Sequence, residues 1–117
     1  MVTHTELLRE SAAANRIPVA LAAVTDPAID PQLPGGAELV AFTDAVLTGS
    51  DDAVAGTRSA VVARLGPDRM VEAAAVCACL QMMNRTTLAA GVPLSRARLA
   101  HTAAMRRDAG LDVFAHE

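Results

Sequence analysis

The stretch GPDRMVEAAAVCACLQMMNRTTLAAG, residues 66–91, decides the fold of this chain. Proline is favoured at the first position of an α-helix and glycine commonly ends one. The sequence therefore predicts one long helix from Pro67 to about Ala90, with Gly91 as its stop. Between Ala73 and Met83 this helix is apolar on nearly all sides, and Gln81 is its polar interruption. Such a helix needs neighbours on most sides, which favours helix-on-helix packing and self-association.

Two helices are predicted directly before the long one. The first spans Ala37–Thr48, and the second begins after Ser50, a residue type typical of helix N-caps, and ends at Gly66. Apolar residues recur at the helical period in both. We expect the inward face of the first to hold Leu39, Val40, Thr43, Val46 and Leu47. We expect the inward face of the second to hold Val54, Val61, Val62 and Leu65.

The two ends of the chain are also predicted to be helical. Thr3 and Glu6 have the spacing of a capping box, which predicts a helix up to about Asn15. A short helical piece at residues 18–24 follows it. At the other end, one last helix is predicted from Ser95 through Ala109, because serine favours a helix start and a glycine follows the alanine.

Prolines and glycines are concentrated in TDPAIDPQLPGG at residues 25–36, which predicts an extended connector. A chain of 117 residues can bury one hydrophobic core. We therefore predict an all-α fold, a single compact and oligomeric bundle of about five to six helices over residues 1–117. Its parts are N-terminal helices at 1–24, the connector at 25–36, a helical core at 37–94, and a C-terminal helix and tail at 95–117.

Composition argues against several classes of function. The formal net charge of −3 gives no reason to expect nucleic acid, and two phenylalanines are the only aromatic residues, so bases have no stacking platform. The apolar run at 73–83 is too short to cross a bilayer. The N-terminus lacks the pattern of a secretory signal. We expect no membrane partner and a cytoplasmic location.

No metal or cofactor site is predicted. His4, His101 and His116 fall at no ligand spacing, and no acidic cluster accompanies them in the sequence. Gly35-Gly36 lacks the lysine and the serine or threonine that follow in a phosphate-binding loop.

Residues 38–94 carry several short motifs in a fixed order. These are a helix end with Phe42, Leu47 and Thr48, a helix with Arg58, an entry with Gly66 and Glu72, the pair Asn84-Arg85, and an exit at Gly91-Val92-Pro93. In this order and spacing, the segment resembles the later part of the alkylhydroperoxidase D-like, or carboxymuconolactone decarboxylase-like, family. The resemblance implies a helical bundle that assembles into homo-oligomers.

Peroxidases of that family use a glutamate, a Cys-x-x-Cys pair and a histidine. This chain has Cys77-Ala78-Cys79 instead, and residues 1–36 contain no cysteine. Two residues apart on a helix, the thiols point about 200° from one another. We expect both cysteines to be small buried residues rather than a redox pair, so the active site is degenerate relative to the family. A thiol peroxidase is the least favoured hypothesis.

Polar residues on and near the long helix are the candidate ligand-binding residues. Gln81 needs a hydrogen-bond partner because it lies within the apolar run. Arg58 and Arg85, with Asn84 beside the latter, have the fork geometry that binds an anion. The alternative for the arginines is structural pairing with acidic groups. Arg85 would then pair at a helix crossing, and Arg58 would pair with Glu72 or with an acidic group across an interface.

Two functional hypotheses remain open. The first is a non-redox member of the family, a homo-oligomer that binds a small organic molecule, for instance an organic acid, or supports a partner protein chain. The second is an enzyme, a cofactor-free lyase, decarboxylase or isomerase with a pocket between helices. In that case Arg58 or Arg85 would hold a carboxylate or enolate, and His101 or Glu72 would move a proton.

Overall fold

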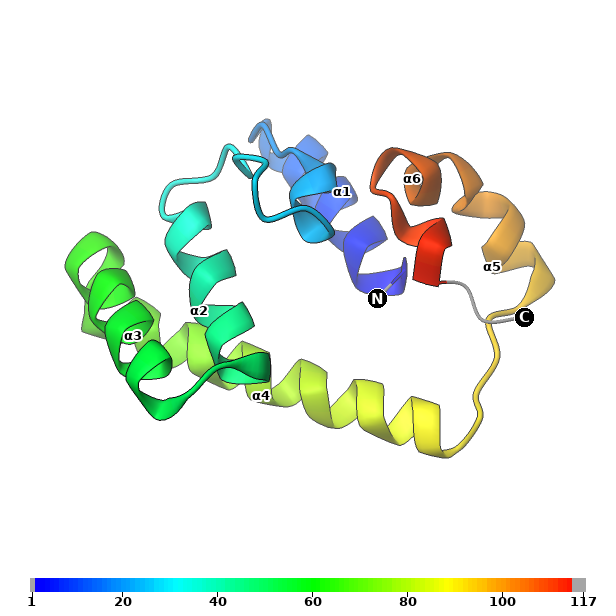
Figure 1. Cartoon of the computed structure of the whole chain (residues 1–117). Helices are drawn as coiled ribbons and strands as arrows, with labels where there is room; N and C mark the ends of the chain where they lie inside the picture. Colours follow the sequence, from blue (N-terminus) through cyan, green and yellow to red (C-terminus); the bar gives the residue numbers. More distant parts are fainter. Residues whose placement is uncertain (1, 115–117) are drawn as a thin grey trace. The chain divides into compact units, whose positions relative to one another are not determined.

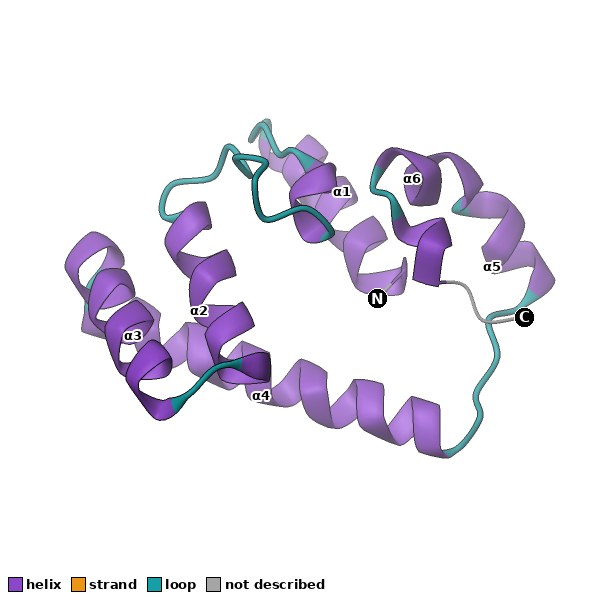
Figure 2. Cartoon of the chain, viewed as in Figure 1, coloured by secondary structure: helices purple, strands orange, loops and turns teal. Residues whose placement is uncertain are grey.

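The computed structural model describes residues 2–114, and every regular element in that range is helical (Figures 1 and 2). The α-helices are α1 Val2–Asn15, α2 Gly36–Thr48, α3 Asp51–Leu65, α4 Pro67–Ala89, α5 Arg96–His101 and α6 Ala103–Asp108. Two 3-10 turns are η1 at Leu21–Val24 and η2 at Leu111–Phe114. The predicted all-α class is confirmed. Within the described range, none of the helices is long and apolar enough to cross a membrane.

The chain divides into two compact units. The central unit is the continuous segment Pro34–Gly91, and the terminal unit combines the described residues up to Leu33 with those from Val92 onward. These boundaries lie close to the predicted limits of the helical core, residues 37 and 94. The single-domain prediction for residues 1–117 stays a prediction.

The central unit consists of α2, α3 and α4, and α3 packs against both of the others. Each helix contributes one large residue to a shared core: Phe42 from α2, Val61 from α3 and Met70 from α4. Partly buried apolar residues pack around these three, namely Leu39, Val54 and Leu65. The second half of α4 extends beyond α2 and α3 (Figure 1).

Local signals set the helix limits in this unit. The hydroxyl of Ser50 accepts a hydrogen bond from the backbone N–H of Ala53 at 3.3 Å, as expected of an N-cap. Pro67 is the first residue of α4. Gly35 precedes α2 with a φ of +70°, and a Cβ added there would lie 2.7 Å from the Leu65 side chain. Both its backbone angle and its contact with the end of α3 therefore favour glycine.

The inward face of α2 differs in part from the prediction. Phe42 and Ala45 are buried, whereas Val46 and Leu47 are 43% and 45% exposed. Apolar residues occur on several sides of this helix, so their period alone does not select the side that meets α3. The same holds on α3, where Val61 is fully buried and the neighbouring Val62 is 38% exposed.

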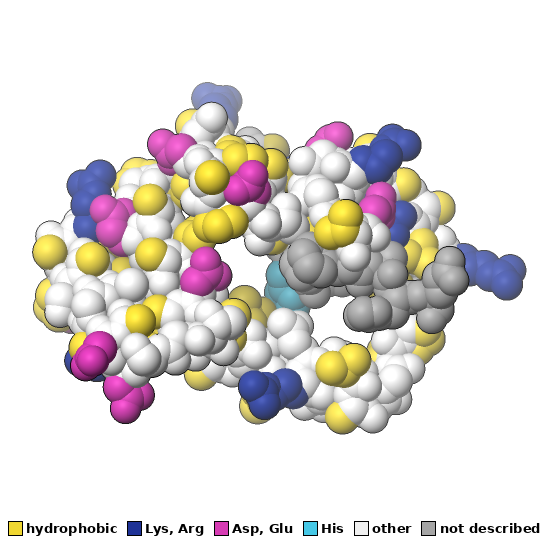
Figure 3. Space-filling model, viewed as in Figure 1, with side chains coloured by type: hydrophobic (Ala, Val, Ile, Leu, Met, Phe, Trp, Pro, Cys, Tyr) yellow, Lys and Arg dark blue, Asp and Glu magenta, His cyan; other side chains and the backbone are white. Residues whose placement is uncertain are grey.

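The long helix α4 is much less covered than its composition predicts. Met70 is its one buried residue, while Val71, Val76 and Met82 are 69%, 57% and 62% exposed. Hydrophobic side chains are visible on the surface along its second half (Figure 3). The neighbours that this helix requires are therefore not supplied by α2 and α3.

The terminal unit joins segments that are far apart in the sequence. Its core contains Met105, Ala109 and Leu111, against which Val2 and Leu21 pack. A side-chain bond links the two segments, because the hydroxyl of Thr25 donates to the backbone carbonyl of Ala109 at 2.8 Å. This unit is thus held together by contacts between residues of both segments.

The last helix, predicted as one element through Ala109, is two helices. Ser95 caps α5 as expected, since its hydroxyl accepts from the backbone N–H of Arg98 at 3.2 Å. The break lies at Thr102, whose φ of −93° and ψ of 4° are not helical. Its hydroxyl donates to the Arg98 carbonyl four residues earlier, a bond that bends helices. Thr102 is fully buried, so packing holds the bend in place.

The predicted capping box at the start of α1 is wrong. Val2 already belongs to the helix, so Thr3 lies inside it rather than at its N-cap. Glu6 does not reach back along the backbone. Its carboxylate instead accepts hydrogen bonds from Arg9, one turn further on.

Candidate functional site

A cavity of about 270 Å³ lies within the central unit, between the second half of α2 and the middle of α4. Its walls are mainly apolar, and two of the predicted ligand-binding residues belong to them. The lining residues are Phe42, Val46, Leu47, Ala74, Cys77, Ala78, Gln81 and Arg85.

The α4 wall follows from helical spacing. Ala74, Ala78, Gln81 and Arg85 are separated by three or four residues, so they form one stripe along the helix. The two alanines leave room for the cavity because their side chains end at Cβ. The polar side chains follow toward the C-terminal end of the stripe. One side of α4 therefore changes from apolar to polar along the length of the cavity.

The α2 wall is entirely apolar. Phe42 is 4% exposed and belongs both to the core of the unit and to the cavity. Val46 and Leu47, the residues expected in the core, border the cavity from its exposed side. Their exposure is therefore explained by the cavity, which separates this part of α2 from α4.

Arg85 has no acidic partner in the described part of the chain. The ion pairs formed there involve Arg9, Arg69, His101 and Arg106. Arg85 is exposed and lies one turn after the half-buried Gln81, so the two side chains are neighbours on the helix surface. A guanidinium and an amide thus border an apolar cavity, which is an arrangement suited to an anion with an apolar body.

The expected pair between Arg58 and Glu72 is not formed. Glu72 pairs instead with Arg69, one turn earlier on α4, at 2.7 Å between Oε2 and Nη1. Arg58 is exposed on α3. Glu72 is nine residues from Gln81, which places the two about 180° apart around α4. Glu72 therefore lies on the opposite side of the helix from the cavity.

The other predicted residues also lie outside the cavity. Asn84 is exposed and is not among the lining residues, although it precedes Arg85 in the sequence. His101 belongs to the terminal unit, where its Nε2 lies 3.6 Å from Oε1 of Glu6. Of the six candidate residues, the cavity brings together Gln81 and Arg85.

The two cysteines occupy different environments. Cys77 is half-buried and lines the cavity, whereas Cys79 is exposed, and both thiols are free. This difference in burial agrees with the divergent directions that helical geometry predicts for residues two apart. The expectation that both are buried is wrong for Cys79, because α2 and α3 leave that side of α4 uncovered.

Sequence reasoning missed the apolar lining of the cavity. The stripe on α4 could have been found from its spacing, because residues 74, 78, 81 and 85 share one side of a helix. The contribution of Val46 and Leu47 had no such signal. Which side of α2 meets α4 depends on how the helices cross, and their apolar periodicity does not state this.

No protein-family model matches this chain, and neither do curated protein sequences or solved structures. The likeness of residues 38–94 to the alkylhydroperoxidase D-like family therefore stays a prediction.

Proposed function

We propose that the central unit binds a small organic anion in the cavity between α2 and α4. The observation that carries this proposal is Arg85, an arginine without an acidic partner in the described chain, at the border of an apolar cavity. The guanidinium would hold the ligand's carboxylate through two parallel hydrogen bonds. Gln81, one turn away, would donate a further hydrogen bond from its amide group.

The cavity limits the size of such a ligand. A volume of about 270 Å³ corresponds to on the order of ten non-hydrogen atoms, taking about 30 Å³ for each as in liquid water. A short-chain or single-ring monocarboxylate meets this limit. Its apolar body would contact the already buried Phe42 and would cover Val46 and Leu47, which are 43% and 45% exposed, and removing these two from water adds to the binding energy.

Binding, rather than catalysis, is the better-supported role. The enzyme hypothesis requires a group that moves a proton next to the substrate. Among the described residues that line the cavity, Cys77 is the one titratable group besides Arg85, and no carboxylate or imidazole is present. Glu72 and His101, the candidate proton carriers, lie elsewhere. The lyase, decarboxylase or isomerase hypothesis therefore has no observation in its favour.

Titration of the full chain with hexanoate, followed by ¹⁵N chemical shifts, tests the proposal. We expect saturable shifts in residues of α2 and α4, and an Arg85→Gln variant whose affinity is at least tenfold lower, consistent with the loss of a charge-assisted hydrogen-bond pair. Arg58→Gln is the matched control, because that arginine is exposed on α3, and its affinity should be unchanged. Equal binding of hexanamide, or equal affinity of Arg85→Gln, would contradict the proposal.

We also propose that the chain self-associates through α4, as a cytoplasmic homo-oligomer. Val71, Ala75, Ala78 and Met82 are spaced by four, three and four residues, which is the spacing of a coiled-coil seam. All four are exposed in the chain, and Ala78 also lines the cavity, so the seam adjoins the cavity. No charged residue occurs between Glu72 and Arg85, and charges are depleted at the centre of protein interfaces. The same helix of a second copy has the matching small and apolar surface.

Sedimentation equilibrium with interference detection tests the association, because the chain has no Trp or Tyr for absorbance at 280 nm. We expect the wild type to form dimers or larger species at micromolar concentration. Val71→Glu places a charge in the seam and should give a monomer. Val113→Glu is the control, since Val113 is 81% exposed but belongs to η2. A monomeric wild type would rule out this assembly while leaving the anion proposal intact.

A further inference from the structure

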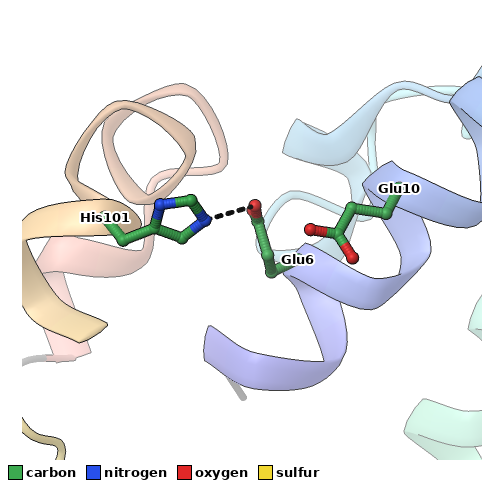
Figure 4. Close-up of side chains that lie close together, drawn as sticks. All are labelled: Glu6, Glu10 and His101. Carbon is green, nitrogen blue, oxygen red and sulfur yellow. Dashed lines mark ion pairs between the residues drawn. The ribbon is translucent and has the colours of Figure 1, made fainter. Parts of the chain in front are cut away.

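Three side chains with metal-binding atoms converge in the terminal unit. Glu6 and Glu10 are one turn apart on α1, and His101 is the last residue of α5 (Figure 4). One donor atom from each of the three lies within 4.8 Å of the others. Nitrogen and carboxylate-oxygen ligands of this kind suit zinc and the neighbouring divalent transition metals.

Glu6 is the buried member of this group. Its side chain is 4% exposed, and Arg9 donates to both carboxylate oxygens, from Nε at 3.1 Å and from Nη2 at 2.6 Å. These hydrogen bonds are the main reason that the pKa of Glu6 lies below its ordinary value, and the nearby Arg98 and His101 act in the same direction. Carboxylates that bind metals are commonly held by such outer partners, which fix their orientation.

The spacing between Glu6 and His101 is unusual for a direct interaction. His101 Nε2 lies 3.6 Å from Glu6 Oε1, which is too long for a hydrogen bond. Two ligands bound to one tetrahedral ion at about 2.0–2.1 Å are about 3.4 Å apart. Figure 4 shows the imidazole and this carboxylate pointing toward one another, with the Glu10 carboxylate beside them. Oε1, the Glu6 oxygen nearest to His101, also accepts the hydrogen bond from Arg9 Nη2, so an ion bound here would share this oxygen with Arg9.

We propose that Glu6, Glu10 and His101 bind one divalent transition-metal ion, for which Zn²⁺ is the probe. Each would contribute one ligand atom, and water would complete the coordination from the open side, where Glu10 is exposed and the His101 side chain is 65% exposed. The two carboxylates balance the charge of the ion. Arg9 and Arg98 add positive charge nearby, so the affinity is lower than that of a four-ligand zinc site.

The consequence of binding would be structural. Glu6 and Glu10 lie on α1 and His101 lies on α5, so the ion would connect the two segments from which the terminal unit is built. An ion that binds the folded chain and not the unfolded chain stabilises the fold in proportion to its concentration. This proposal does not rest on the anion-binding cavity, which belongs to the central unit.

Calorimetric titration of Zn²⁺ into the full chain, after chelator treatment, tests the site. Cys77 and Cys79 are replaced by alanine in all samples, because thiolates bind zinc strongly. We expect one ion per chain and a dissociation constant at least tenfold higher for His101→Ala. His4→Ala is the matched control, because that histidine also lies on α1 but outside the cluster, and it should leave the affinity unchanged.

A second variant keeps the test independent of folding defects. Glu10 is exposed, so Glu10→Gln should retain the far-ultraviolet circular dichroism of the parent and still bind Zn²⁺ at least tenfold more weakly. Zn²⁺ should also raise the thermal unfolding midpoint of the parent and not that of His101→Ala. The proposal would be overturned if the parent showed no saturable binding. It would also be overturned if His101→Ala and Glu10→Gln bound Zn²⁺ with the same affinity as the parent.

Discussion

The central and terminal units form helices by different means. In the central unit, one continuous segment supplies three helices, and residues such as Ser50 and Pro67 mark where the helices begin. In the terminal unit, two distant segments meet through single side chains, as in the bond from Thr25 to the Ala109 carbonyl. Short-range signals therefore set helix limits in the first unit. In the second, the arrangement depends on partners that are more than eighty residues apart.

The largest effect is expected from the core of the central unit. Phe42→Ala removes a ring that is 4% exposed and packed with Val61 and Met70, so the free energy of unfolding should fall by about 3–5 kcal/mol. Native-state hydrogen exchange of amides in α3 measures this loss. Val62→Ala, at a position 38% exposed, should cost less than about 1 kcal/mol. If amides of α6 lose the same protection as those of α3, the two units unfold together and the contrast between them fails.

A smaller effect is expected from the bond between the segments of the terminal unit. Thr25→Val keeps the shape of the side chain but removes the donor to the Ala109 carbonyl, so amides of α6 should lose about 1–2 kcal/mol of protection. Thr86→Val is the control, because that hydroxyl donates to the Met82 carbonyl within its own exposed helix. If Thr86→Val lowered the protection of the α6 amides as much as Thr25→Val, the bond between the segments would not account for the loss.

The smallest effect is a pH dependence located in the terminal unit. Hydrogen bonds from Arg9 lower the pKa of Glu6 in the folded chain below its ordinary value of 4.5. The ionised carboxylate therefore stabilises the fold above that pH, and this contribution disappears as the pH falls through the lowered pKa. Glu6→Gln should flatten the decrease in the thermal midpoint below pH 4.5, measured with a chelator present. Glu10→Gln, at an exposed carboxylate, is the comparison, and identical curves for Glu6→Gln and wild type would contradict this account.

Much of the helical layout could be predicted from the sequence. Pro67 and the glycine beyond α4 gave its limits to within a residue or two, and Ser50 and Ser95 cap the helices expected of them. These signals act over one turn, so they are visible in a short window of sequence. The break at Thr102 was missed because it depends on burial of that residue as well as on its local hydroxyl bond.

The sites were harder to predict than the helices. Gln81 and Arg85 can be predicted because polar residues are conspicuous within and at the end of an apolar run. The sequence of α2 does not indicate which of its apolar residues line the cavity. Glu72 is polar and close to the apolar run, but it lies on the side of α4 away from the cavity and pairs with Arg69. The cluster around His101 was excluded for lack of acidic neighbours in the sequence. Its neighbours come from α1, at the other end of the chain.

The discontinuity of the terminal unit has a consequence for biosynthesis. All residues of the central unit have been added once the ribosome has passed Gly91, and its contacts join neighbouring helices. Glu6 and Thr25, by contrast, are synthesised before the central unit, whereas their partners His101 and Ala109 are synthesised after it. We expect the nascent chain to fold from the middle outward, with α1 exposed to chaperones and proteases until the residues from Val92 onward have been synthesised.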